Sequence, residues 1–135
     1  MEILSAVWHH AYLAVTFRSN GKGLPTRPSS SFWFLVACSL LVSIFRLCIV
    51  EGQSLFFAVL GDVITLVFLS LSFRGTRFVF VPAFLAVSIG IDAFASLSEP
   101  FLPPATHWLL YAWGLAAYFI TATKVTNRLR AERVL

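Results

Sequence analysis

Charged side chains are scarce in this sequence of 135 residues, where Asp, Glu, Lys and Arg together make up only 12%. An ordinary soluble domain carries about 25% charged residues. Hydrophobic residues account for 59% of the chain, including 14 Phe and 4 Trp. Because so few polar groups cannot cover a water-facing surface, the composition excludes an ordinary soluble protein and predicts an integral membrane protein of one domain.

Cysteine and histidine, which most often bind metals or attack substrates, are also rare. Cys38 and Cys48 lie in one apolar run, and on a helix they are separated by about 15 Å, too far for a disulfide. His9 and His10 are adjacent and point about 100° apart on a helix, whereas His107 is expected on the opposite side of the membrane. With no serine or carboxylate in a catalytic pattern either, we predict no metal, no cofactor and no enzyme activity.

Four apolar segments are each long enough to cross about 30 Å of hydrocarbon as a helix. They cover residues 31–50, 54–73, 78–97 and 106–123. Glu-Gly-Gln, Arg-Gly-Thr-Arg and a proline-rich stretch separate them, and these residue types end helices. The sequence therefore predicts an all-α integral membrane protein, in which residues 31–123 form an antiparallel four-helix transmembrane bundle.

The basic residues lie on one side of these predicted spans. All ten Lys and Arg residues except Arg46 fall before the first span, between the second and third, or after the fourth. Because Lys and Arg are retained in cytoplasmic loops, we expect both termini in the cytoplasm and the protein in the cell inner (plasma) membrane. Residues 124–135 form a basic cytoplasmic tail, in which Lys124, Arg128 and Arg130 are candidates to bind lipid headgroups or an acidic partner. Nucleic acid is not an expected partner.

The first 17 residues are predicted to form an interfacial helix rather than a fifth span. An apolar stripe at helical spacing contains Ile3, Leu4, Val7, Trp8, Ala11, Tyr12 and Val15. Such an amphipathic helix lies along the membrane surface, with aromatic rings at headgroup depth. The chain starts with an acid and has two histidines in this segment, so we predict no cleavable signal peptide. Residues 18–30 are expected to be a flexible cytoplasmic linker.

Polar residues in the first three spans recur every three or four positions, which places them on one helical face. The stripes are Ser39, Ser43 and Arg46; then Asp62 and Thr65; then Ser88, Asp92, Ser96 and Glu99. Membrane helices associate through such faces, so Ser43, Thr65, Ser88 and Ser96 are predicted to lie in seams between helices. Gly61, beside Asp62, is predicted to let a neighbouring helix approach closely.

Arg46, Asp62 and Asp92 lie inside the predicted spans, at about 7, 12 and 8 Å below the outer ends of their helices. At this common depth, the sequence predicts an intramembrane charge network of the three residues. Charges at membrane depth usually pair and mark a function. The network is interpreted as a structural clasp, as a recognition site for a partner's intramembrane polar group, or as a proton- or ion-coupled path. The sequence leaves open which aspartate pairs with Arg46.

The leading functional hypothesis is a small non-catalytic accessory protein that binds or stabilises another membrane protein of an envelope machine, such as a pilus or secretion system. Its expected partners are the lipid bilayer and either another integral membrane protein or a second copy of itself. One alternative is a small transporter or flippase subunit that uses Arg46, Asp62 and Asp92 for coupling. Others are a phage holin, a toxin-immunity protein, or a lipid-active enzyme that uses the two aspartates as an acid–base pair.

Overall fold

The computed structural model describes residues 1–132, which form α-helices and short helical turns and contain no β-strand. The α-helices are α1 (Glu2–Val15), α2 (Ser30–Phe45), α3 (Leu55–Ser72), α4 (Phe80–Ser98) and α5 (His107–Ala131). The turns η1 (Arg46–Val50), η2 (Gly75–Val79), η3 (Glu99–Phe101) and η4 (Pro104–Thr106) extend or precede them. The predicted all-α class is confirmed for the described residues.

Local sequence signals explain where these helices begin and end. The side chains of Ser29 and Ser54 cap α2 and α3 by accepting hydrogen bonds from the backbone N–H groups of Phe32 and Phe57, as serine does at helix starts. Gly52 and Gly75 adopt positive φ angles of 69° and 63° in the two turns that follow α2 and α3. Only glycine adopts this conformation without steric cost.

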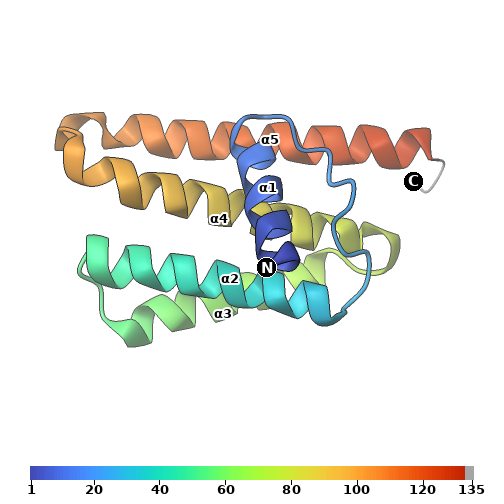
Figure 1. Ribbon diagram of the computed structural model, residues 1–135, viewed down its shortest axis with the longest axis horizontal. Coiled ribbons are helices and arrows are strands. Elements are labelled where there is room, and N and C mark those ends of the chain that lie inside the picture. Colours follow the sequence, from blue (N-terminus) through green and yellow to red (C-terminus); the bar gives the residue numbers. More distant parts are fainter. Residues whose placement is uncertain (133–135) are drawn as a thin grey trace.

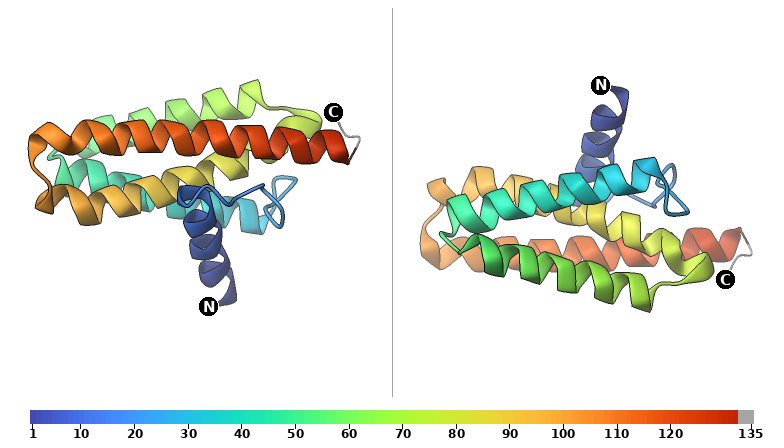
Figure 2. Two further views of the ribbon diagram at one scale, coloured as in Figure 1. Left: turned by 90° about the horizontal axis from the view of Figure 1, so that it is seen from above. Right: turned by 90° about the horizontal axis from the view of Figure 1, so that it is seen from below.

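The long helices α2, α3, α4 and α5 run lengthwise beside one another, and α1 crosses them at a steep angle (Figure 1). The two views in Figure 2 show α1 projecting outward from the other helices toward the N-terminus. Helix α4 packs against α1, α2 and α5, whereas α3 contacts mainly α2 and η1. Helix α4 is therefore the centre of the molecule and α3 is its periphery.

The core lies along α4 and consists largely of small side chains. Val81, Ala83, Ala86, Val87 and Ile89 are almost fully buried. In contrast, many large apolar side chains remain exposed on the surface of the long helices, among them Leu41, Ile49, Phe56, Phe68, Leu97 and Phe119. A surface this apolar is unusual for a soluble monomer.

Three helical stretches are long and apolar enough to cross a membrane: Ser30–Val50, Leu55–Ser72 and Gly75–Phe101. They match the first three predicted spans. The fourth predicted span, residues 106–123, is not among them, because its Trp, Tyr and His side chains make it less apolar than the others. It belongs to the longer helix α5, which continues through Lys124, Arg128 and Arg130 to Ala131. The predicted tail is thus helical up to this point, and Arg133 lies outside the described residues.

Helix α1 is held against α4 by a close backbone approach. Val7, Ala11 and Ala14 are buried on its inner side, while Trp8 and Tyr12 are exposed. A Cβ atom added at Gly90 of α4 would clash with Val15 and would lie 2.8 Å from the carbonyl oxygen of Ala11. Glycine at position 90 is therefore what lets α1 cross α4 at this distance.

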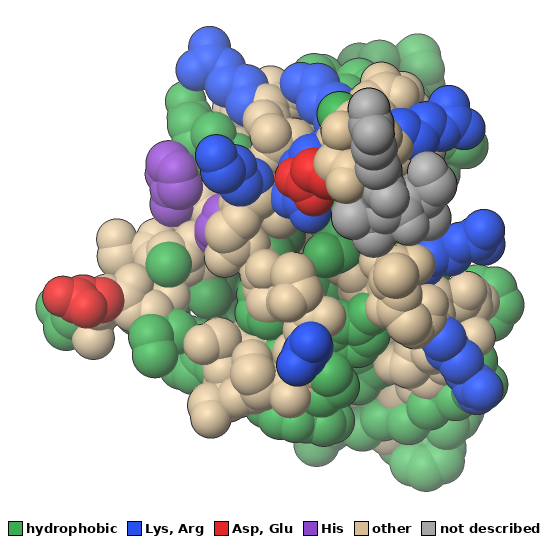
Figure 3. Space-filling model, turned by 90° about the vertical axis from the view of Figure 1, so that its right-hand side faces the viewer, with side chains coloured by type: hydrophobic (Ala, Val, Ile, Leu, Met, Phe, Trp, Pro, Cys, Tyr) green, Lys and Arg blue, Asp and Glu red, His purple; other side chains and the backbone are tan. Residues whose placement is uncertain are grey.

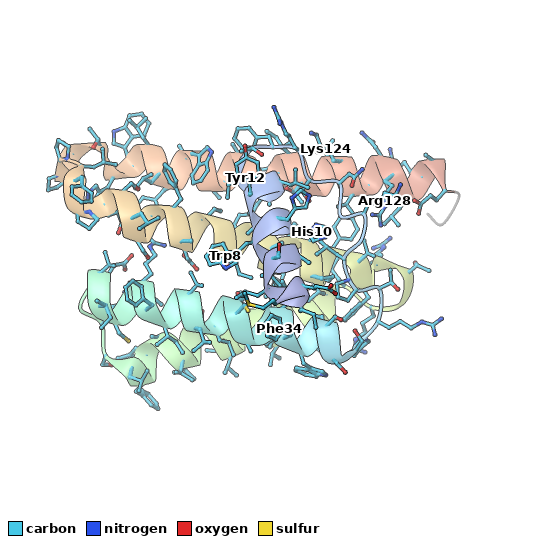
Figure 4. The ribbon with its side chains drawn as sticks, in the orientation of Figure 1. Trp8, His10, Tyr12, Phe34, Lys124 and Arg128 are labelled. Carbon is cyan, nitrogen blue, oxygen red and sulfur yellow. The ribbon has the colours of Figure 1, made fainter. Side chains whose placement is uncertain are left out.

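The linker between α1 and α2 lies against the other helices rather than away from them. Ser19 and Leu24 are buried, and Gly21 lies next to Val125 of α5. Lys124 donates a hydrogen bond to the carbonyl oxygen of Phe17 at the end of α1. Figure 4 shows Lys124 and Arg128 on α5 beside this part of the chain.

Candidate functional site

Arg46 stands where α2 changes into the π-helical turn η1, and it is surrounded by acidic side chains. Its guanidinium lies 3.0 Å from Asp92 Oδ1, 3.0 Å from Glu99 Oε1 and 2.9 Å from Glu51 Oε1. The ring of Tyr111 is 6.0 Å away. We call Arg46, Glu51, Asp92 and Glu99 the Arg46 cluster. π-Helical turns are rare and often occur at functional sites.

The Arg46 cluster ties three parts of the chain together: the end of α2, the turn after it, and the end of α4. The side chains of Arg46, Asp92 and Glu99 are 12%, 13% and 7% exposed. Charge-assisted hydrogen bonds in such a poorly solvated place are strong. With all groups ionised, three carboxylates against one guanidinium leave the cluster with a formal excess of negative charge.

Both oxygens of Asp92 have partners. Oδ1 accepts a hydrogen bond from Arg46, and Oδ2 accepts one of 3.4 Å from Ser88, one helical turn earlier. Ser96, one turn later, donates to the backbone carbonyl of Asp92 at 2.7 Å. The predicted polar stripe of α4 thus converges on Asp92, which joins α4 to Arg46, while Ser88 and Ser96 lie where α4 faces neighbouring helices.

Asp62 lies near Asp92, close enough for their charges to interact, but no ion pair joins it to Arg46. Its Oδ1 accepts a hydrogen bond of 2.9 Å from Ser43, which connects α3 to α2. Its Oδ2 is buried and has no hydrogen-bond partner among residues 1–132. An unsatisfied buried acceptor is costly and calls for a physical explanation.

A cavity of about 50 Å³ lies beside Asp62, between the four long helices. Hydroxyl groups from each of the other three helices reach it, because Ser39, Ser88 and Tyr118 line it together with Thr65 of α3. The Thr65 hydroxyl itself donates to the carbonyl of Gly61, within its own helix, at 2.9 Å. Since α3 and α5 make few direct contacts, the cavity lies where a side chain from outside could reach Asp62.

The predicted network of three charges is therefore divided in the structure. Arg46 and Asp92 are together, Asp62 is not paired with Arg46, and Glu51 and Glu99 complete the Arg46 cluster. The sequence contained a signal for Glu51 and Glu99, because Glu99 continues the stripe of Asp92 and Glu51 follows the span that contains Arg46. Gly61 was predicted to allow close helix packing, but nothing lies within 4 Å of a Cβ built there. That prediction is wrong, and Gly90 has the role instead.

The three basic residues of the predicted tail differ in their surroundings. Lys124 holds the end of α1 through the carbonyl of Phe17. Arg128 is partly buried, with its Nε 3.6 Å from Glu132 Oε1, and Arg130 is exposed. Within the described part of the chain, no group of three or more His, Cys, Asp or Glu side chains is placed to bind a metal ion.

Comparison of the chain with protein-family models, curated proteins and solved structures finds no match.

Proposed function

We propose that this is an integral membrane protein in which α2 to α5 form an antiparallel four-helix transmembrane bundle with both termini in the cytoplasm. The three long apolar helices and the exposed apolar side chains support insertion. Arg27, Arg128 and the turn that contains Arg74 and Arg77 lie at the same end of the long helices, which supports the orientation. In a bundle oriented this way, α1 lies parallel to the membrane plane but crosses α4 at Gly90, inside the span, so it is not at the headgroup depth that its sequence led us to expect (Figure 1).

We infer that the protein is a non-catalytic accessory protein that binds another integral membrane protein through α3. The observation that carries this inference is the buried, unpartnered Oδ2 of Asp62 on the helix that the rest of the chain covers least. Ionisable groups at membrane depth pair with one another or with a partner's polar groups. The fitting occupant is a transmembrane helix that carries a Lys or Arg at the depth of Asp62.

The surroundings of Asp62 favour such a partner. Thr65, which lines the cavity, is itself exposed, and so is Gly61 one turn earlier on the same face of α3. The large exposed side chains of Ile64, Val67 and Leu71 lie on the far side of α3 from Asp62 and are left to contact lipid. A second helix can pack beside Gly61 and Thr65, where no Cβ or bulky side chain blocks its approach, while its basic side chain enters the cavity and gives Asp62 the donor that it lacks. In hydrocarbon, packing and interhelical hydrogen bonds drive helix association.

A transporter or flippase subunit is the second candidate, because hydroxyl groups line the cavity beside Asp62 and could guide a cation to it. At about 50 Å³, the cavity has room for only a few water molecules. This size supports a binding site for one side chain more than a path across the membrane.

Site-specific photocrosslinking tests the accessory function. A photoreactive residue at Val63 or Phe68, which are exposed at different angles around α3, should crosslink in native membranes to one other membrane protein. The crosslink should be lost in Asp62→Asn and retained in Asp62→Glu, since only a carboxylate pairs with a basic group. Leu115, exposed on α5, is the control position and should give no such product.

Three outcomes would contradict the proposal. A crosslink that persists in Asp62→Asn would separate binding from the acid. Products formed only between two copies of this chain would indicate self-association. If Asp62→Asn instead abolished proton or cation flux in proteoliposomes and left crosslinking unchanged, transport would replace binding as the function.

A further inference from the structure

A second polar cavity lies at the end of the molecule where Lys and Arg side chains gather (Figure 3). It has a volume of about 650 Å³ and is bounded by the linker, the turn between α3 and α4, and the C-terminal part of α5. Cavities that bind small ligands have roughly this volume, about 300–1,000 Å³. It is separate from the Arg46 cluster and from the cavity at Asp62.

One wall of this cavity is polar and basic. Arg27 of the linker and Arg128 of α5 line it, together with Thr26 and Thr76, and the single acid at the cavity among residues 1–132 is Glu132. Arginine presents a planar set of donors that matches the oxygens of a phosphate group. Two arginines and two hydroxyl groups from separate segments therefore make a suitable binding surface for a phosphate.

The guanidinium of Arg128 has a donor to spare. Its Nε is buried and has no hydrogen-bond partner in the described part of the chain. Glu132 Oε1 is 3.6 Å away, which is too long for a hydrogen bond. The Glu132 side chain is 55% exposed, so it can turn into water when an anion approaches Arg128.

The other wall of the cavity is apolar and includes Phe78, Val79 and Leu129. A free phosphate ion gains nothing from such a surface. An amphiphile does, because its charged group can contact the arginines while its glycerol and acyl carbons contact the apolar wall.

We propose that this cavity binds the phosphate group of an anionic membrane lipid, with Arg27 and Arg128 as its ligands. The inference rests on the proposed membrane topology, which puts this end at the cytoplasmic surface, where basic pockets between helices bind anionic headgroups. The lipid would then hold the linker, the turn between α3 and α4, and α5 together at the membrane surface.

Native mass spectrometry of the full chain in detergent tests this proposal, with phosphatidylglycerol or phosphatidylcholine added as the probe. We expect the wild type to retain phosphatidylglycerol and not phosphatidylcholine. Because a basic residue near an anionic lipid contributes about fivefold in affinity, the Arg27→Gln/Arg128→Gln variant should bind phosphatidylglycerol about 25-fold more weakly. Arg27→Gln alone, which changes an exposed side chain, should lose about fivefold and keeps the test valid if the double variant does not fold.

The matched control is Arg18→Gln/Arg130→Gln, which removes the same charge from the residues before α2 and from α5 but outside the cavity. It should retain the lipid. Equal losses in the two double variants, or equal retention of the two lipids, would overturn the proposal. Displacement of the lipid by millimolar inorganic phosphate would identify free phosphate as the ligand and overturn the lipid assignment. None of these variants changes α3, so failure here is distinguishable from failure of the α3 crosslinking experiment.

Discussion

Helices α3 and α4 each carry a glycine and an aspartate close together in an apolar sequence, yet the structure uses the two pairs in opposite ways. Over an 18-residue window of each span, 67% of the residues are buried in the stretch that contains α4 and only 6% in α3. Gly90 of α4 lies against the backbone of α1, whereas Gly61 of α3 faces open space. Asp92 has partners for both oxygens, whereas Asp62 has a partner for one.

This difference gives Asp92 a structural role within the chain and leaves Asp62 with one carboxylate oxygen that lacks a partner among the described residues. Asp92 forms an ion pair with Arg46 of the same chain. The charge of Asp62 is only partly satisfied, on a helix with an apolar surface that is free to contact lipid or another protein. Two similar short sequences thus have different roles, because their helices occupy the centre and the edge of the molecule.

The largest expected effect comes from Arg46→Ala, which breaks the α4 side of this comparison. It leaves the carboxylates of Glu51, Asp92 and Glu99 without their cation, and stranding a buried charge costs about 3–5 kcal/mol. We expect a loss of this size in the free energy of unfolding in detergent, and reduced accumulation in membranes.

Asp62→Asn on α3 should change the free energy of unfolding by less than about 1 kcal/mol. The amide oxygen can still accept the Ser43 hydrogen bond, and the substitution removes the charge of the carboxylate whose Oδ2 has no partner in the part of the chain that the structure describes.

A double variant provides the control for the Arg46→Ala prediction. Adding Asp92→Asn to Arg46→Ala removes one of the stranded charges and should recover part of the lost stability. If Arg46→Ala changed neither membrane accumulation nor unfolding, the Arg46 cluster would not hold the helices together.

The two glycines give the next largest effect and change the two helices in opposite directions. Gly90→Ala places a Cβ against Val15 and 2.8 Å from the Ala11 carbonyl oxygen, so α1 must shift, at a cost of about 1–3 kcal/mol. Gly61→Ala meets nothing within 4 Å and should stabilise α3 by about 0.5–1 kcal/mol, because alanine favours a helix. Thermal unfolding in detergent, with proteolysis of α1 as a second measure, compares the two variants. Equal shifts at both positions would contradict the difference between α3 and α4.

The sequence predicts the helical segments well because their signals are local. Runs of apolar residues, serine caps and glycine turns place α2 with η1, α3 and α4 within two residues of the expected boundaries, and the stripe in the first 17 residues predicts α1. The prediction is less accurate for α5, where aromatic side chains and a charged C-terminal part obscure the limits of the helix.

The candidate site could be predicted only in part because it depends on helix packing. Spacing along one helix places Ser88, Asp92 and Ser96 on a common face, and they do act together. Whether Arg46 reaches Asp62 or Asp92 depends on which helices are neighbours, and that order is not encoded in any single stripe. For the same reason the sequence could not show which glycine lies in a tight contact.

The smallest expected effect is on pH dependence, and it concerns α1, which packs mainly on α4. His10 lies next to Gly23 of the linker, and burial there, together with the neighbouring His9, lowers the pKa of His10 below its ordinary value of 6.5. The folded protein therefore binds this proton less readily than the unfolded chain, so the contribution to stability is complete above pH 6.5 and declines as the pH falls through the folded pKa. We expect proteolysis of α1 to become faster as the pH falls below 6.5 in the wild type and to lose this pH dependence in His10→Gln. Labelling of a cysteine introduced at Phe68 on α3, in a background without Cys38 and Cys48, should stay constant with pH. A dependence that persisted in His10→Gln would assign the titration to another group and remove His10 as the cause.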